Sequence, residues 1–375
     1  MASTYVDVHV IQTVPPSNLN RDETGSPKSA RYGGVRRARV SSQAWKRATR
    51  LHFHNHLDPA QLGVRTRRVI ELLAHKLSDT GRFAEDKVHE LARATLESLG
   101  LKTKSAEDDT SQFLLFMGMR NVDAVVSALV DRAEELGAAN KTELKKILKD
   151  MKLADLLAGK QPIDVALFGR MVADVPAINV DAAAQVSHAI STHPVNIEFD
   201  YFTAVDDENP AEDTGAGMIG TVEFNSATLY RYASVSVDLL AENLGEEADA
   251  PAAVGLFIDS FIRSMPTGHQ TSFAHRTLPE FVQIMVRDDQ PVNLVGAFEQ
   301  PVEARRGSES IAMNSIAAFL DWDAKMREAY GLTPLLTTTS AVQLPEGAED
   351  TVTTVPLAQA IDQVVTAVSG ERSDT

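Results

Sequence analysis

A strict alternation of apolar and polar residues opens the chain. In the stretch YVDVHVIQTV (residues 5–14), Val6 and Val8 fall on one face, while Asp7 and His9 fall on the other. A period of two residues is typical of a strand with one buried face. The proline pair that follows cannot donate backbone hydrogen bonds, so we expect the strand to end there.

Two more alternating stretches predict a β-hairpin near the middle of the chain. They are IEFDYFTAV (197–205) and TVEFNSATLYRYASVSV (221–237), and the acidic, glycine-containing run DDENPAEDTGAG lies between them. Alternating segments around a polar tip are typical of a long hairpin, which we place at 196–225. Shorter stretches predict further strands at VRRARV (35–40), VALFGRM (165–171) and FVQIMV (281–286).

Helical periodicity dominates the residues that follow the first strands. Apolar residues recur at three- and four-residue spacing through residues 64–158, which predicts four helices. Ser41 or Ser42 has a side chain that caps helices, and the helix it starts is expected to run to about Leu57. Other helices are expected at 181–191, 252–264 and 308–330. Strands on both sides of a helical block predict an α+β fold with a helical insertion.

The net charge of −16 conceals a strongly basic segment. Residues 21–82 contain 14 Lys and Arg against 5 Asp and Glu. Cations neutralise phosphates, and amides and hydroxyls make directed hydrogen bonds, so this composition predicts a nucleic-acid site. A solvated surface with structural ion pairs is the alternative. The predicted helix has one polar face, made of Gln43, Lys46, Arg47 and Arg50. Trp45 lies opposite this face, and we expect it to pack inside.

Other features exclude several classes of function. The chain has no cysteine, which removes disulfides and thiolate chemistry and indicates a reducing compartment, so we expect the cytoplasm. No apolar run approaches the roughly 20 residues of a membrane-spanning helix, and we see no signal peptide. Gly215, Gly217 and Gly220 spell G-x-G-x-x-G, but a strand is predicted where a dinucleotide site needs a helix. We therefore expect no membrane partner, no cofactor and no metal.

Several long segments resemble one known family. The run NLNRDETGSPKSARYGGVRRARVSSQAWKRA (18–48) is similar to the N-terminal signature of the CasC family, the backbone subunits of Cascade in type I-E CRISPR systems. The segments PIDVALFGRMVAD (162–174), HAISTHPVNIEFDYFTAVDD (188–207) and FNSATLYRYASVSVDLLAENLG (224–245) resemble the same family in the same order. The resemblance covers nearly the whole chain.

This resemblance implies a hand-shaped α+β subunit of the RAMP superfamily. It implies an RRM-like (ferredoxin-like) palm with an inserted helical finger region and a β-hairpin thumb. On that pattern, the palm takes residues 1–57, 159–195 and 226–375, the finger insertion takes 58–158, and the thumb takes 196–225. The implied function is a non-catalytic antiviral role in a ribonucleoprotein complex. Several copies form a helical array on one CRISPR RNA and hold it for pairing with target DNA, beside other Cascade subunits and a recruited helicase-nuclease.

The resemblance also implies individual binding residues. The family's RNA-contacting positions match Arg21, Lys28, Ser41, Gln43, Lys46 and Met171. Arg47 and Arg50 join them from the polar helix face. Phe202 and Thr203 match thumb positions that press on a displaced nucleotide. The aromatic stacking consensus of ordinary RRM domains is absent, so we expect the RNA backbone to be recognised and its sequence to be tolerated.

Asp22 carries the rival hypothesis. In related type III subunits an aspartate in such a loop cuts RNA, so a metal-dependent ribonuclease using Asp22 is the alternative function. Type I relatives resemble pure binders, and we expect no catalytic residue here, with Asp22 in a structural role beside Arg21. A monomeric single-strand RNA chaperone is a third possibility, which particle mass on a defined RNA distinguishes.

Overall fold

The computed structural model describes residues 3–104, 109–204, 218–245, 248–303 and 310–370. Two compact units make up the chain. The first contains Met1–Phe53, Gln185–Val237 and Pro251–Thr375, and the second contains His54–Ala184 and Asp238–Ala250. Each unit is described by itself below.

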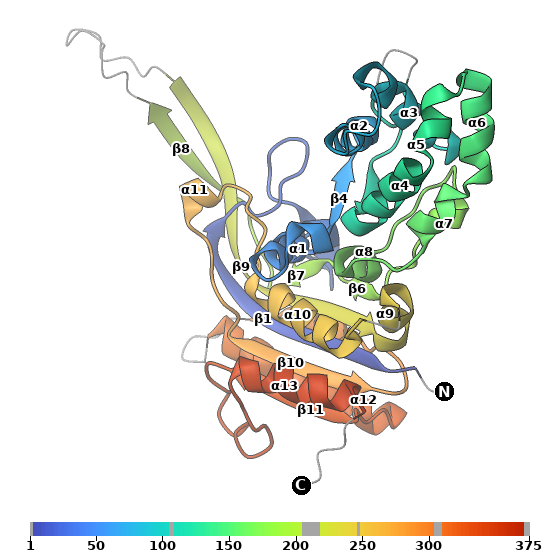
Figure 1. Cartoon of the computed structure of the whole chain (residues 1–375). Coiled ribbons are helices and arrows are strands. Elements are labelled where there is room, and N and C mark those ends of the chain that lie inside the picture. Colours follow the sequence, from blue (N-terminus) through green and yellow to red (C-terminus); the bar gives the residue numbers. More distant parts are fainter. Residues whose placement is uncertain (1–2, 105–108, 205–217, 246–247, 304–309, 371–375) are drawn as a thin grey trace, which may run out of the picture. The chain divides into compact units, whose positions relative to one another are not determined.

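A sheet with a long central strand forms the middle of the first unit (Figure 1). Strand β1 (Tyr5–Ser17) pairs antiparallel with β10 (Phe281–Arg287) on one side and with β9 (Met218–Ser236) on the other. The order is β11-β10-β1-β9-β7-β3-β2, and β6 and β8 also pair with β9. The remaining strands are β2 (Ser29–Tyr32), β3 (Val35–Val40), β6 (Ala184–Val186), β7 (Ala189–Ser191), β8 (Glu198–Ala204) and β11 (Leu336–Ala341).

The connections of this sheet identify a ferredoxin-like core. Along the chain, β1, α1 (Ser42–His52), β7, β9, α10 (Ala250–Arg263) and β10 follow one another as β-α-β-β-α-β. Helix α1 packs on α10, with Thr49 Oγ1 3.4 Å from Ser264 Oγ and His52 Nδ1 3.1 Å from Ser260 Oγ. The prediction of an α+β, RRM-like palm is therefore confirmed.

Helices cover both faces of the central strands. On one face, Arg231 of β9 donates a hydrogen bond to the carbonyl of Phe261 in α10. On the other face, the ring of His9 lies 5.3 Å from that of Phe319 in α12 (Ile311–Tyr330). Asp7 and His9 are consequently 0% exposed, so the expectation of a strand with one buried face is wrong. An alternating sequence shows which side chains share a face of the strand, but it does not show whether another element covers the polar face, as α12 does here.

Polar side chains on the enclosed face make hydrogen bonds to other protein groups. The Asp7 carboxylate accepts hydrogen bonds from Tyr232 Oη at 2.8 Å and Val292 N at 2.9 Å, and Arg287 Nε lies 3.2 Å away. Burial nevertheless raises the pKa of Asp7. His9 Nδ1 lies 2.9 Å from Tyr230 Oη, and burial lowers the pKa of His9 to about 3, so the ring is neutral.

Strand β1 also runs through the proline pair, where we expected it to end. Strand β10 pairs with β1 only as far as Ile11 and Phe281, so both prolines have a partner strand on one side only. The register with β9 shifts between Val14 and Ser17, as at a bulge. Prolines are tolerated at such places because no ladder hydrogen bond is lost.

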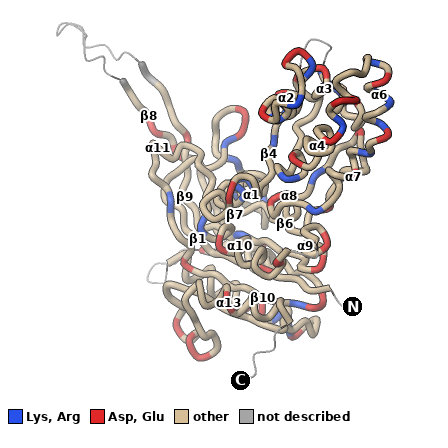
Figure 2. The backbone as a smooth tube through the Cα atoms, viewed as in Figure 1, with Lys and Arg blue, Asp and Glu red and all other residues tan. Residues whose placement is uncertain are grey.

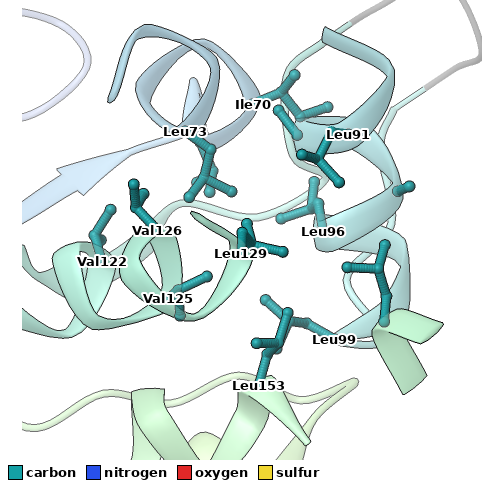
Figure 3. Packing of buried hydrophobic residues seen from close by; sticks show 14 of the residues in the cluster. Ile70, Leu73, Leu91, Leu96, Leu99, Val122, Val125, Val126, Leu129 and Leu153 are labelled. Carbon is teal, nitrogen blue, oxygen red and sulfur yellow. The ribbon is translucent and has the colours of Figure 1, made fainter. Parts of the chain in front are cut away.

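The second unit is mainly helical. Leucine and valine side chains from its helices meet in one core, where Leu73, Leu91, Val125 and Leu129 are at most 1% exposed (Figure 3). A two-stranded ribbon, β4 (Gly63–Thr66) with β5 (Leu115–Gly118), completes it. The helices are α2 (Val69–Asp79), α3 (Glu85–Ser98), α4 (Met119–Asp131), α5 (Ala133–Ala138), α6 (Lys141–Asp150), α7 (Leu153–Ala158), α8 (Ile163–Phe168) and α9 (Val237–Leu244).

Some elements differ from the sequence predictions. The expected strand at 165–171 lies mostly in helix α8, because a short apolar run fits a buried helix as well as a strand. The expected helix at 181–191 contains strands β6 and β7, since pairing with β9 overrides local preference. The helix after Ser41 ends at His52 rather than near Leu57. The ribbon β4–β5, strand β11 and helix α13 (Leu357–Val368) were not predicted.

Candidate nucleic-acid interface

Helix α1 has the amphipathic structure expected from its sequence. Ser41 Oγ accepts the N–H of Ala44 at 3.3 Å, which makes Ser41 the N-cap. Trp45 is fully buried, whereas Gln43 and Arg47 are exposed, and Figure 2 marks the cations in blue. No acidic residue lies in the first turn, so the positive end of the helix dipole favours an anion there.

The loop after β1 is hydrogen-bonded to the start of this helix. Asn20 Oδ1 accepts the N–H of Ser41 at 2.9 Å, and the Asn20 carbonyl accepts the N–H of Lys28 at 2.9 Å. The Lys28 carbonyl in turn accepts the N–H of Arg39 at 2.9 Å. Lys28 is therefore held close to the helix N-terminus. The sequence indicated Lys28 and Ser41 but not Asn20, whose side chain makes the connection.

His188 belongs to the same place and was missed by sequence reasoning. Its Nδ1 accepts the N–H of Ser42 at 3.2 Å and lies 3.5 Å from Arg39 Nη1. Burial lowers the pKa of His188, and the charges of Arg39 and Lys28 lower it further. No local signal could have found His188, because the pairing of β3 with β7 brings it to the helix. We call the following set the basic cradle: Arg21, Lys28, Arg39, Ser41, Gln43, Lys46, Arg47 and Arg50.

Arg21 connects the cradle to the base of the β8–β9 hairpin. Its Nη1 lies 3.2 Å from Nε2 of His269, whose ring is 6.3 Å from that of Phe273. The Phe273 ring is 5.9 Å from the ring of Phe224 on β9. The amide of Asn18 adds a second connection, since it donates to the carbonyl of Glu223 at 3.0 Å. The loop after β1 and the base of the hairpin are thus packed together.

Asp22 has a structural role, but not through Arg21. One carboxylate oxygen, Oδ1, accepts hydrogen bonds from Thr24 N at 2.9 Å, Thr24 Oγ1 at 2.7 Å and Ser26 N at 3.1 Å. The hydrogen bond from the Thr24 hydroxyl is the main cause that lowers the pKa of Asp22. Among the described residues, Asp22 belongs to no group of three His, Asp or Glu side chains able to share one metal ion.

One arginine and one tryptophan of the basic segment, Arg37 and Trp45, are buried and have structural roles. Arg37 is 0% exposed and donates to the carbonyls of Ser191 at 2.9 Å and Phe298 at 2.7 Å. Trp45 is also 0% exposed, and the guanidinium of Arg231 lies 3.8 Å from its ring centroid. The expectation that Trp45 packs inside is confirmed. The guanidinium of Arg37 is buried and hydrogen-bonded to carbonyl groups, so it is not accessible to a ligand.

The hairpin holds its aromatic residues on two different faces. Phe202 is paired with Gly220 across the strands, and a Cβ added at Gly220 would lie 2.5 Å from Phe202 Cζ, so the ring covers the glycine. Phe202 remains 37% exposed. Phe199 and Tyr201 alternate with it, share the other face with Thr203, and are 68% and 62% exposed. The acidic tip at 206–217, with Gly215 and Gly217, lies outside the described residues.

Met171 lies in the second unit, on a strongly anchored turn. Its side chain is 86% exposed, although its neighbour Arg170 is buried. Arg170 Nε donates to the Ile178 carbonyl at 2.6 Å, and Nη2 donates to the Leu157 carbonyl at 2.8 Å. Burial lowers the pKa of Arg170 to about 10. The structure therefore places Met171 on the surface of the second unit, and its predicted contact with RNA stays a prediction.

The sheet face that ordinary RRM domains use for RNA is closed in this protein. In those domains, aromatic side chains on the central strands stack on bases. Here the aromatic residues on that face, Tyr230 and Tyr232, are at most 6% exposed, and α12 covers them. This face therefore offers no exposed tyrosine of the central strands to a ligand, whereas the cations of the basic cradle lie outside it.

Fold and surface together define the class of protein. It is a ferredoxin-like α+β protein with a closed sheet face and a group of cations on helix α1 and the loop that precedes it. The chain belongs to the CT1975-like protein family, whose model matches residues 6–367.

Two solved structures are similar over almost their whole length. One is described as "CRISPR RNA-guided surveillance complex, pre-nicking"; it is 33% identical, with a TM-score of 0.83, over 97% of this chain and 99% of that chain. Another, described as "CRISPR RNA-guided surveillance complex", is 28% identical, with a TM-score of 0.75 and the same coverage. A comparison with curated proteins found no match. The resemblance to subunits of CRISPR surveillance complexes is thereby confirmed.

Proposed function

We propose that this protein is a non-catalytic, RNA-binding backbone subunit of a type I-E Cascade complex. Several copies would line one CRISPR RNA and hold it for pairing with target DNA in the cytoplasm. The observation that carries the proposal is the basic cradle, which joins a capped helix N-terminus, Lys28 and Arg39 within one hydrogen-bonded loop. The similarity to surveillance-complex chains supplies the biological setting.

The cradle suits a guide of any sequence. Phosphate groups are bound by cations, helix N-termini and backbone N–H groups, none of which distinguishes bases. The closed sheet face supports this mode, because it offers no exposed aromatic platform for base stacking. Guide bases that the protein does not contact can pair with a target strand, as RNA-guided recognition requires.

The β8–β9 hairpin supplies the element that would divide the guide between copies. Phe202 is held over Gly220 with part of its ring exposed, which suits contact with a nucleotide. Phe199 and Tyr201 on the opposite face are suited to a neighbouring copy or another Cascade subunit. The division of the chain into palm, finger and thumb segments remains a prediction.

The absence of catalysis is also part of the proposal. All the hydrogen bonds of Asp22 Oδ1 go to its own turn, at 2.7–3.1 Å from Thr24 and Ser26. A metal-dependent nuclease needs carboxylates that are oriented toward an ion and its water. The hydrogen bonds of this turn support a structural role for Asp22, and a recruited helicase-nuclease would do the cutting.

Co-purification tests the function directly. We expect the chain, expressed with a CRISPR RNA of defined length, to purify with that RNA and with several copies per RNA, measured by native mass spectrometry. Guides lengthened in steps should add copies in steps. Recovery without RNA, or as one copy whatever the guide length, would contradict the proposal, and the latter result would favour the chaperone hypothesis.

A further inference from the structure

The second unit has an exposed patch of cations and apolar side chains that the proposed function does not use. It lies where the β4–β5 ribbon meets the neighbouring loop, and Figure 2 shows blue positions on β4. The members are all exposed: Arg65, Arg67, Lys102, Lys104, Phe113 and Leu114. We call this set the ribbon patch.

Hydrogen bonds hold the apolar part of the patch beside its cations. Ser111 is 2% exposed, and its N–H and Oγ both donate to the Arg67 carbonyl, at 2.7 Å and 3.0 Å. The same hydroxyl lies 2.7 Å from the Phe113 carbonyl. Arg67 Nη2 donates to the carbonyl of Gln112 at 3.3 Å. Phe113 is thus fixed next to Arg67 with 44% of its surface exposed.

The lysines reach the patch through a second set of backbone bonds. The N–H of Gln112 donates to the Lys102 carbonyl at 2.9 Å, and the N–H of Lys104 donates to the Thr110 carbonyl at 3.1 Å. Arg65 lies on β4 with its guanidinium 5.2 Å from the Phe116 ring centroid, and Arg67 directly follows the strand. Strand pairing and hydrogen bonds thus bring the segments that carry the four cations beside the segment that carries Phe113 and Leu114.

Two cations near the patch form ion pairs within the described part of the chain, and the patch cations differ from them in this respect. Arg68 lies 3.6 Å from Glu71, and Arg93 forms an ion pair with Asp109. Within the described part of the chain, the four patch cations form no ion pair. Cations without a carboxylate partner keep their full attraction for phosphate groups.

We propose that the ribbon patch is a second binding site for single-stranded nucleic acid, separate from the basic cradle. Its cations neutralise phosphates, and a base stacks on the exposed ring of Phe113, the combination used by proteins that bind single strands without sequence preference. An acidic protein segment would satisfy the cations equally, but it would gain less from an exposed phenyl ring at the centre. The proposal concerns residues outside the cradle, so it is tested separately from the proposed function.

The experiment compares two double variants of the RNA-loaded protein. Arg67→Ala with Phe113→Ala removes one cation and one ring from the patch. Lys325→Ala with Tyr330→Ala likewise removes one exposed cation and one exposed aromatic ring, here from α12, and is the control. Binding of fluorescein-labelled 20-mers of dT and of U is measured by anisotropy while the cradle is occupied. Circular dichroism verifies folding, and Phe113→Leu with Arg67 intact isolates the ring.

We expect the patch variant to bind at least fivefold more weakly than the control, since stacking contributes about 1–3 kcal/mol per base. A loss for dT assigns the site to DNA, a loss for U alone assigns it to an RNA segment, and both results support the site. Equal affinities of the two variants for both oligonucleotides overturn it. So does loss of a co-purifying protein subunit with oligonucleotide binding unchanged. RNA retained per copy is measured in parallel and reports on the proposed function alone.

Discussion

Removal of two cations from helix α1 gives the most quantitative test of the basic cradle. The variant combines Lys46→Ala with Arg50→Ala, which removes two side chains that lie one helical turn apart on the polar face of α1. The logarithm of single-strand affinity falls with the logarithm of salt concentration, with a slope of about 0.7 per phosphate contacted. Two lost contacts should therefore reduce the slope by about 1.4.

This slope predicts how the defect changes with salt. Between 50 and 200 mM salt the concentration rises fourfold, so the ratio of wild-type to variant affinity should shrink by about sevenfold. Fluorescence anisotropy with labelled RNAs of two unrelated sequences measures both quantities. The defect should be the same for the two sequences, because the cradle contacts phosphates and not bases.

A control must remove the same charge elsewhere on the first unit. Arg263→Ala with Lys325→Ala removes two exposed cations from α10 and α12. We expect this control to keep the wild-type slope. An unchanged slope for the α1 variant would refute the cradle as a phosphate site. A defect confined to one RNA sequence would refute backbone recognition.

Four further predictions follow from individual contacts. Gly220→Ala should displace the Phe202 ring and abolish periodic nuclease protection of long RNA while short-RNA affinity persists; intact periodicity would contradict the role of that ring. Asp22→Ala should leave RNA as uncut as the wild type does in magnesium, and a cleavage ladder from wild type alone would contradict this. Trp45→Ala should lower the unfolding free energy in urea by about 3–5 kcal/mol without weakening RNA binding by the folded fraction. Between pH 7 and 5, the unfolding free energy of the wild type should fall by about 2 kcal/mol more than that of His9→Gln. The reason is that His9 is protonated in the unfolded chain over this range, whereas the buried ring, with a pKa of about 3, stays neutral. Equal losses of unfolding free energy in the two proteins would contradict this prediction.

Local sequence was sufficient wherever one segment determines its own structure. Ser41 and the spacing of Trp45 and Lys46 predicted both the N-cap and the two faces of α1. The alternation on either side of the acidic run predicted the pairing of β8 with β9. The burial of α1 is nevertheless not a matter of residue type alone, since the apolar Leu51 is 43% exposed. The predicted RNA contacts of the cradle, Met171, Phe202 and Thr203 stay predictions.

Features made by distant segments could not be predicted. From the sequence, Asp7 and His9 are expected on the solvent-exposed face of a strand. In the structure, that face is covered by α12, which lies more than 300 residues later in the chain. His188 reaches Ser42 across 146 residues, through the pairing of β3 with β7. The stretch 165–171 is apolar enough for either a strand or a helix, and its surroundings in the second unit decide. Among the described residues, no helix has both the length and the hydropathy to span a membrane.

The glycine beneath Phe202 has a thermodynamic consequence. A large side chain on an exposed strand ordinarily samples several rotamers, and a binding partner that fixes it must overcome about 0.5–1.5 kcal/mol of lost freedom. Because Phe202 lies against the bare backbone of Gly220, that freedom is already given up when the hairpin folds. This entropy is therefore lost when each chain folds, before any ligand binds. If many copies bind one strand, a small saving per copy multiplies along it, so a single methyl group at position 220 would act on the stability of a whole assembly.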